Sequence, residues 1–310
     1  MTDLLSYNGN PSAVPAFRII AIVEGDIHAE PSRGALAAIY SRFEAAFGES
    51  ANVTSYNFPG HTGKIRWTNP ELIADGQNYF RRDNTEYGEG IRRYGYAIEE
   101  FKEPAVPYFC VEQRSHFHFL EIDLPETAPS IPEFADFVTE QLLKVHLITG
   151  VMGFGFFLPP YKNSLEFIMG AAVARFKAAI EISPSMVMDG VLREGSAYRW
   201  KSGEQAGIAD IGWRTLVGQE FWDRLPPTED LRSQPDIAVD KSDSVLSITA
   251  GSEPIWGDVN KGEAIDSYRA VAAYLSPVQM PAGCLKAFAF GGTGEPTHND
   301  KVEAYLSRFE

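Results

Sequence analysis

The stretch that decides the fold lies at residues 247–277 and reads Ser247-Ile-Thr-Ala-Gly-Ser-Glu-Pro-Ile-Trp-Gly-Asp-Val-Asn260, then Asp266-Ser-Tyr-Arg-Ala-Val-Ala-Ala-Tyr-Leu-Ser-Pro277. Its apolar, β-branched start predicts a strand over 245–250. The residues that follow predict a sharp turn: Pro254, Gly257, Asp258 and Asn260. A helical pattern over 263–275 ends at Pro277, because proline cannot continue a helix. No catalytic motif occurs here, so the stretch points to a protein that acts by binding.

The same two patterns recur along the rest of the chain. Runs of β-branched and aromatic residues predict strands at 17–23, 53–58, 64–67, 106–111, 117–124, 151–158 and 285–290. Apolar residues at helical spacing predict helices at 31–48, 69–82, 131–150, 165–180 and 208–225. A charged connector is expected at 226–243. Because strands and helices do not alternate strictly, and hairpins are expected, the pattern favours an α+β fold with mixed or antiparallel sheets and packed helices.

Chain length bounds the domain organisation. At 310 residues the chain is long for one hydrophobic core, so we expect a single domain over 1–310 or two closely packed lobes of about 1–160 and 161–310. The order strand, helix, strand recurs at 17–58, 117–157 and 245–290, which favours similar architecture in the lobes.

Composition excludes several classes of protein. Apolar residues make up 44% and charged residues 22% of the chain, as in globular domains. No run of about 18 apolar residues could span a membrane, and residues 1–7 lack the features of a secretory signal. The two cysteines, Cys110 and Cys284, do not make a disulfide framework, so the cytoplasm is the expected compartment.

Charge is the strongest compositional signal. The net charge is −15, which disfavours direct binding to nucleic acid and suits a basic protein partner. The segment 115–143 holds six acids and no Lys or Arg, and the segment 220–266 holds eleven acids against four bases. Whether the two acidic segments share one face of the molecule stays open at this stage.

Residue types that carry catalysis are present but poorly arranged. Alternation along a strand would place His116 and His118 on one face and Glu121 and Asp123 on the other, so no metal site is expected. Cys110 lies inside an apolar run, where a buried and inert thiol is the common outcome. The glycines at 150–155 follow a helix rather than precede one, which is the reverse of a dinucleotide-binding turn. We therefore predict no catalytic residue, no metal and no cofactor.

The turn after residue 250 is the best candidate for a binding site. It carries two acids, a tryptophan and an asparagine, namely Glu253, Trp256, Asp258 and Asn260. A tryptophan displayed among acids can anchor a protein partner. In the alternative interpretation these are ordinary turn residues, and Trp256 closes the core. Glu121 and Asp123, from the first acidic segment, complete the predicted binding residues.

Three blocks of the sequence resemble the type VI secretion immunity proteins. The first is the strand and helix at 17–47, and the third is the stretch at 247–277. The second combines Thr149-Gly-Val-Met-Gly-Phe, the 165–180 helix, and Ile211-Gly-Trp-Arg-Thr-Leu-Val-Gly. Relatives often carry an Arg-Tyr-Pro-Gly-like segment where this chain reads Ile180-Glu-Ile-Ser-Pro-Ser-Met, and the acidic stretch at 233–244 also departs from the family pattern.

The resemblance implies an antitoxin-like role. Members of this family bind a toxin, called the effector, that is delivered by a type VI secretion system, and several such effectors are nucleases. The resemblance implies stoichiometric occlusion of the active site or DNA-binding face in the cytoplasm, without a cofactor, membrane attachment or nucleic-acid binding. The free protein would be a monomer or a small homo-oligomer.

Two other classes remain open from the sequence. One is a metal-dependent or hydrolytic enzyme of unknown substrate, built around His116, His118 and Cys110. The other is a structural component of a secretion apparatus, for which extensive self-assembly is expected.

Overall fold

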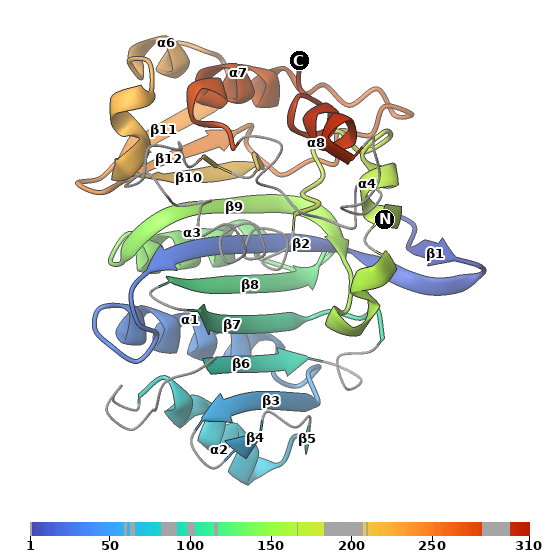
Figure 1. The fold of residues 1–310 in the computed structure, drawn as a ribbon, viewed down its shortest axis with the longest axis vertical. Coiled ribbons are helices and arrows are strands. Elements are labelled where there is room, and N and C mark those ends of the chain that lie inside the picture. Colours follow the sequence, from blue (N-terminus) through green and yellow to red (C-terminus); the bar gives the residue numbers. More distant parts are fainter. Residues whose placement is uncertain are drawn as a thin grey trace.

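An antiparallel sheet organises the chain in the computed structural model (Figure 1). The structure describes residues 2–58, 61–62, 66–81, 92–97, 103–114, 117–165, 167–182, 207–208, 210–280 and 298–310. These residues contribute twelve strands: β1 (Leu5–Tyr7), β2 (Asn10–Glu24), β3 (Val53–Phe58), β4 (His61–Thr62), β5 (Arg66–Trp67), β6 (Arg92–Ala97), β7 (Tyr108–Arg114), β8 (Phe117–Pro125), β9 (His146–Phe157), β10 (Arg214–Gly218), β11 (Ile237–Lys241) and β12 (Val245–Ala250).

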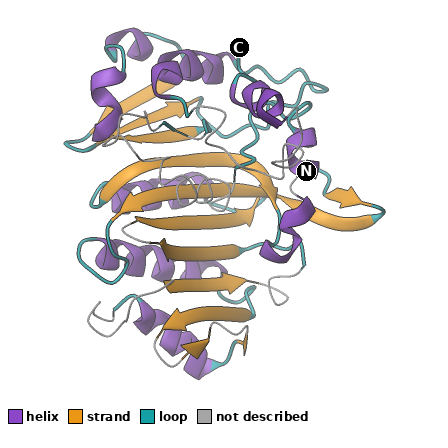
Figure 2. Ribbon diagram, in the orientation of Figure 1, coloured by secondary structure: helices purple, strands orange, loops and turns teal. Residues whose placement is uncertain are grey.

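Helices pack around this sheet, as the colouring by secondary structure shows (Figure 2). They are α1 (Ser32–Phe47), α2 (Pro70–Tyr79), α3 (Ile131–Leu142), α4 (Phe167–Ala172), α6 (Glu229–Arg232), α7 (Asp266–Leu275) and α8 (His298–Leu306), with 3₁₀ helices η3 (Pro160–Leu165), η4 (Gln219–Arg224) and η5 (Ser276–Val278). The α+β prediction is therefore confirmed.

Strand β2 lies in the middle of the sheet, whose order is β11-β12-β10-β9-β2-β8-β7-β6-β3-β4. It pairs antiparallel with β8 and β9, so that Ile19 lies opposite Ile122 and Met152. Residues 16–23 are all buried, because other elements cover both faces of the strand. That double burial explains why the run 17–23 is almost continuously apolar rather than alternating.

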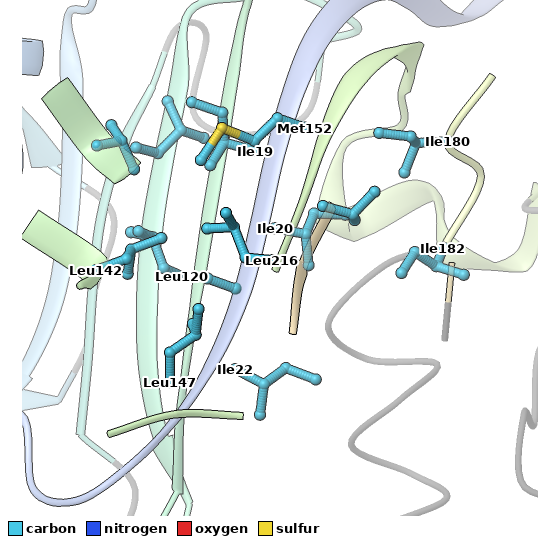
Figure 3. Packing of buried hydrophobic residues seen from close by; sticks show 14 of the residues in the cluster. Ile19, Ile20, Ile22, Leu120, Leu142, Leu147, Met152, Ile180, Ile182 and Leu216 are labelled. Carbon is cyan, nitrogen blue, oxygen red and sulfur yellow. The ribbon is translucent and has the colours of Figure 1, made fainter. Parts of the chain in front are cut away.

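Helices α1 and α3 cover one face of the sheet and lie behind it in Figure 1. Helix α1 buries Leu36, Ile39, Tyr40 and Phe43, and α3 buries Phe134, Ala135, Val138 and Leu142, in each case at the spacing of one helical face. In Figure 3, Leu142 of α3 lies on one side of the strands, and Ile180 and Ile182 lie on the other. The sheet is thus covered by helices on one face and by the segment that contains Ile180 and Ile182 on the other.

The predicted helix over 131–150 is wrong in its second half. It ends at Leu142, and β9 begins at His146, which lies opposite Glu24 of β2. Leu147 and Ile148 look like a continuation of the apolar helical stripe. As part of β9 they are buried instead in the sheet, where an apolar, β-branched run fits equally well.

The predicted helix over 208–225 is also wrong. Residues 214–218 form β10, which pairs with β9 and β12, and among the described residues of this range only 219–224 are helical, as the 3₁₀ helix η4. Leu216 and Val217 point to opposite faces of the sheet and are both fully buried, so the strand has apolar residues on both faces. A short apolar run of this kind cannot be distinguished by its periodicity from a buried helix. At Gly218 a Cβ atom would lie 2.3 Å from the Leu147 carbonyl oxygen, so the two strands require a glycine there.

The predicted helix over 165–180 shrinks to α4, Phe167–Ala172. The residues after it run as a connection that makes isolated bridges, Phe176 with Asp258 and Ile180 with Gly155. The connector predicted at 226–243 contains α6 and the edge strand β11. The strand predicted at 285–290 lies outside the described residues.

The two predicted lobes share one sheet. Strands β9 and β10, which come from either side of residue 160, hydrogen-bond to each other. The division of the chain into one domain or two lobes stays a prediction.

We predict that Gly155→Ala destabilises the protein by about 2–3 kcal/mol, the cost of overpacking a core. A Cβ at residue 155 would lie 2.3 Å from the Ile180 carbonyl oxygen and 2.7 Å from Arg18 Cδ. Urea unfolding measures the loss. The matched control is Gly150→Ala in the same strand, where the nearest atom is the flexible Leu216 side chain at 3.3 Å. Equal losses for the two variants would contradict the prediction.

Candidate functional site

The predicted binding turn, residues 251–262, is packed into the molecule only at its middle, residues 256–258. Trp256 is only 5% exposed. Its ring stacks on Phe154 with 5.3 Å between ring centres and also packs against Phe156. Its indole Nε1 donates to Glu126 Oε2 at 3.1 Å, so the one polar atom of the side chain is satisfied inside the fold. These contacts fit the interpretation in which Trp256 closes the core.

Asp258 is buried in the same turn and holds an arginine. Arg175 donates from Nε to Oδ1 at 2.9 Å and from Nη2 to Oδ2 at 2.8 Å, which makes a bidentate pair. The bond from Arg175 lowers the pKa of Asp258. The other two predicted turn residues, Glu253 and Asn260, are exposed. Of the four predicted binding residues in the turn, only these two have side chains that are open to a partner.

Glu121 and Asp123 lie on one face of β8, as alternation predicts, and both bind Arg18 of β2. Arg18 Nε donates to Asp123 Oδ1 at 2.8 Å, and Nη2 donates to Glu121 Oε1 at 2.9 Å. Its Nη1 donates to the carbonyl oxygens of Ile180 and Ile182 at 3.0 and 2.9 Å. Asp123 is fully buried and Glu121 is partly exposed. The two predicted acids therefore serve a buried cation.

Burial and charge oppose each other at this pair. Burial alone would lower the pKa of Arg18, but the charges of Asp123 and Glu121 outweigh it and raise that pKa. Burial raises the pKa of Asp123, while Arg18 acts to lower it. Asp123 Oδ2 has no hydrogen-bond partner in the described part of the chain.

The connection 175–182, called the strap below, links the turn to Arg18. At one end, Val259 N donates to the Arg175 carbonyl at 3.0 Å, and Ala178 N donates to the Trp256 carbonyl at 3.0 Å. At the other end, the carbonyls of Ile180 and Ile182 accept from Arg18. The structure thus connects the turn that carries four of the predicted residues to the Arg18 site of the other two through one segment. Three of the six, Trp256, Asp258 and Asp123, are buried. Their role in effector binding stays a prediction.

A second buried charged cluster fixes the C-terminal helix to the strap. Arg308 Nη2 donates to Asp210 Oδ1 at 2.6 Å, and Arg308 Nε donates to the Lys177 carbonyl at 3.1 Å. Tyr305 Oη donates to Asp210 Oδ2 and accepts from Glu181 N, the latter at 2.9 Å. Glu181 is fully buried, and neither of its carboxylate oxygens has a hydrogen-bond partner among the described residues. Burial raises the pKa of Glu181 well above its usual range.

An open groove of about 420 Å³ lies between α3 and the strands β10–β12. Its lining comes from both acidic segments, with Asp136 and Glu140 from α3 and Asp240 from β11. Arg214 of β10 also lines the groove and binds Asp136 at 2.7 Å. The two acidic segments therefore share a face at this groove, which the sequence left open.

Of the residues considered for catalysis, the two that the structure describes, His118 and Cys110, lie apart. His118 is buried, with Nδ1 at 3.1 Å from the Gly25 carbonyl oxygen. It pairs with Gln113 of β7, whereas Cys110 pairs with Glu121, so alternation puts His118 and Cys110 on opposite faces of the sheet. His116 and Cys284 lie outside the described residues. Within the described ranges, no three His, Cys, Asp or Glu side chains are grouped to hold a metal ion.

Sequence reasoning missed the arginines that organise the acids. Arg18 is the one charge in the apolar run 17–23, and Glu121 and Asp123 are charges inside a strand that is otherwise largely apolar. A charge in a strand buried on both faces requires a partner, so this signal was available. Arg175, Arg214 and Arg308 gave no comparable signal, because their surroundings were assigned to helices or to no element.

No protein-family model matches the sequence, and no curated protein matches it. Among solved structures, the fold is similar to that of the Pseudomonas aeruginosa T6SS protein PA0821. The TM-score is 0.74 at 14% sequence identity, and the likeness covers 96% of this chain and 85% of that chain. At this identity the likeness establishes a shared fold. Every helix in the described ranges is too short or too polar to cross a bilayer.

We predict that Arg18→Met costs about 3–5 kcal/mol of unfolding free energy, because it leaves buried Asp123 without its cation. The control is Arg33→Met, which removes an arginine from the more exposed pair with Glu30. That change should stay within about 0.5 kcal/mol. Chemical denaturation measures both, and an Arg18 variant as stable as the control would contradict the buried-pair interpretation.

Glu181→Gln should stabilise the protein at pH 8 and change it little at pH 4. The unfolded chain loses this proton above about pH 4.3, whereas the folded chain keeps it to higher pH because its pKa is raised. Stability then falls by about 1.4 kcal/mol per pH unit until the folded pKa is reached, and glutamine removes this loss. Urea unfolding at the two pH values measures it. The control Glu303→Gln changes an exposed acid of α8. An equal effect of Glu181→Gln at both pH values would contradict the prediction.

Proposed function

We propose that this chain is an immunity protein that binds and neutralises an effector of a type VI secretion system. The observation that carries the proposal is the fold likeness to a T6SS protein over 96% of the chain. The three sequence blocks that resemble immunity proteins point in the same direction. Alone, either observation gives less: the structure match supplies a fold, and the sequence blocks supply a family resemblance.

The charge of the chain supports a basic effector, and we propose a nuclease. A nuclease must present a basic surface to the phosphates of its substrate. A protein of net charge −15 is attracted to such a surface and associates quickly with it. The proposed action is stoichiometric occlusion of the active site or DNA-binding face in the cytoplasm, without catalysis. Nuclease–immunity pairs reach Kd values of about 10⁻¹³ M or below, so occlusion alone can be sufficient.

The same fold likeness is compatible with a second candidate, a structural component of the secretion apparatus. The two candidates differ in self-association. A structural component should assemble into large particles, whereas an immunity protein should stay a monomer or small oligomer until its effector is present. Sedimentation of the purified chain separates them.

We predict that the chain captures the toxin-like product of a neighbouring gene as a 1:1 complex. Association should slow as salt rises from about 50 to 500 mM, because salt screens charges at the complex rim. Co-expression should also protect cells from that toxin. The control is an unrelated acidic protein of similar net charge. No capture, or large assemblies of the chain alone, would refute the immunity proposal.

A further inference from the structure

We propose that the groove between α3 and β10–β12 receives a lysine or arginine side chain of the effector protein. The inference rests on the proposed function and names the contact surface, which the sequence did not locate. The groove, of about 420 Å³, falls in the size range of about 300–1,000 Å³ found for specific ligand sites.

The floor of the groove holds a polar atom with nothing to bind. Ser247 of β12 is 8% exposed and lines the groove. Its residue pairs in register with Leu216 of β10 and Asp240 of β11. No hydrogen bond is formed by its hydroxyl in the described structure, whereas the neighbouring Thr249 hydroxyl accepts from Arg214 at 3.2 Å. Because the serine is nine-tenths buried and its hydroxyl is unpaired, the hydroxyl oxygen can accept a hydrogen bond from a ligand in the groove.

The walls of the groove carry two acids without partners. Glu140 is exposed on α3, and Asp240 is exposed on β11. Within the described ranges neither carboxylate forms an ion pair or hydrogen bond, and both residues line the groove. The third acid, Asp136, is already bound to Arg214. The two free carboxylates therefore come from opposite walls and from the two acidic segments.

The cations in the groove are already engaged. Arg214 is held at 2.7 Å by Asp136, at 3.1 Å by Thr139 and at 3.2 Å by Thr249. The Lys241 ammonium lies over the Trp222 ring, 4.0 Å from its centre. With both cations fixed in this way, the groups left to recognise a ligand are two carboxylates and one hydroxyl. They match the donors of a lysine or arginine side chain.

The test compares three variants of the full chain against the captured effector by calorimetry. Glu140→Gln with Asp240→Asn removes both free acids, and Ser247→Ala removes the floor acceptor without changing charge. The control, Glu133→Gln with Asp243→Asn, removes two exposed acids near the same elements that do not line the groove. We expect both groove variants to weaken binding at least about tenfold and the control less than about threefold.

A second probe, an octa-arginine peptide, tests the groove without the effector. Saturable binding that the groove variants reduce more than the control supports the proposal. Equal reduction in the groove and control variants, with either probe, would overturn it in favour of unspecific attraction. Self-association that the groove variants abolish would assign the groove to a second copy and also overturn it. If the peptide selects the groove but no effector is captured, the immunity proposal fails and the cation site stands.

Discussion

A guanidinium group buried at the centre of the sheet constrains much of this structure. Arg18 lies in β2, which has a strand on each side and cover on both faces. A charge in that position is tolerable only if its donors are used and its charge is balanced. Two carboxylates of β8 and two carbonyls of the strap meet that demand. The acidic pair 121 and 123 and the course of the strap therefore follow from one residue.

The contact between Arg18 and the strap in turn depends on two glycines and on the binding turn. Arg18 reaches the strap across β9, and Gly155 leaves room for the arginine side chain and for the Ile180 carbonyl. The other end of the strap needs a second anchor, which Asp258 provides through Arg175. At Gly257 the backbone has φ of +65°, and a Cβ there would lie 2.7 Å from Ala178 N, so the turn can press against the strap only with glycine. The turn within the stretch 247–277 thus also holds the strap in place, through the Asp258–Arg175 pair and the backbone hydrogen bonds.

The sequence predicted the elements that have a single buried face or clear end signals. Helix α1 has one apolar stripe, and α2 begins directly after its N-cap Asn69, whose side chain accepts from Leu72 N at 2.9 Å. Strands with β-branched runs, such as 17–23, were equally clear. Two of the failures share a cause: residues 147–150 and 215–218 are strand residues buried on both faces, and a short apolar run of that kind has no period that separates strand from helix.

Only those features of the candidate site that depend on local residue types, such as the turn, could be predicted from the sequence. The turn residues at 254–260 showed that a sharp turn was present, but not that Trp256 would face Phe154, because that partner lies about a hundred residues away in the sequence. Likewise, pairing between Arg18 and the acids of β8 depends on register, and register is set by the whole sheet. Patterns within a short stretch of sequence do not show which distant residues pair with each other.

The groove depends on the same misread segments. If 208–225 were a helix and 226–243 a loop, the sheet would stop at β9, and α3 would have no neighbouring strands beyond it. Because 214–218 is a strand, β12 and β11 extend the sheet past α3, and the register sets Asp240 opposite Ser247. Two acidic segments about a hundred residues apart thereby face each other across a polar floor. Part of the negative charge seen in the composition is thus gathered at the groove. It is gathered there because β10, which was predicted as a helix, pairs as a strand and extends the sheet to β12 and β11.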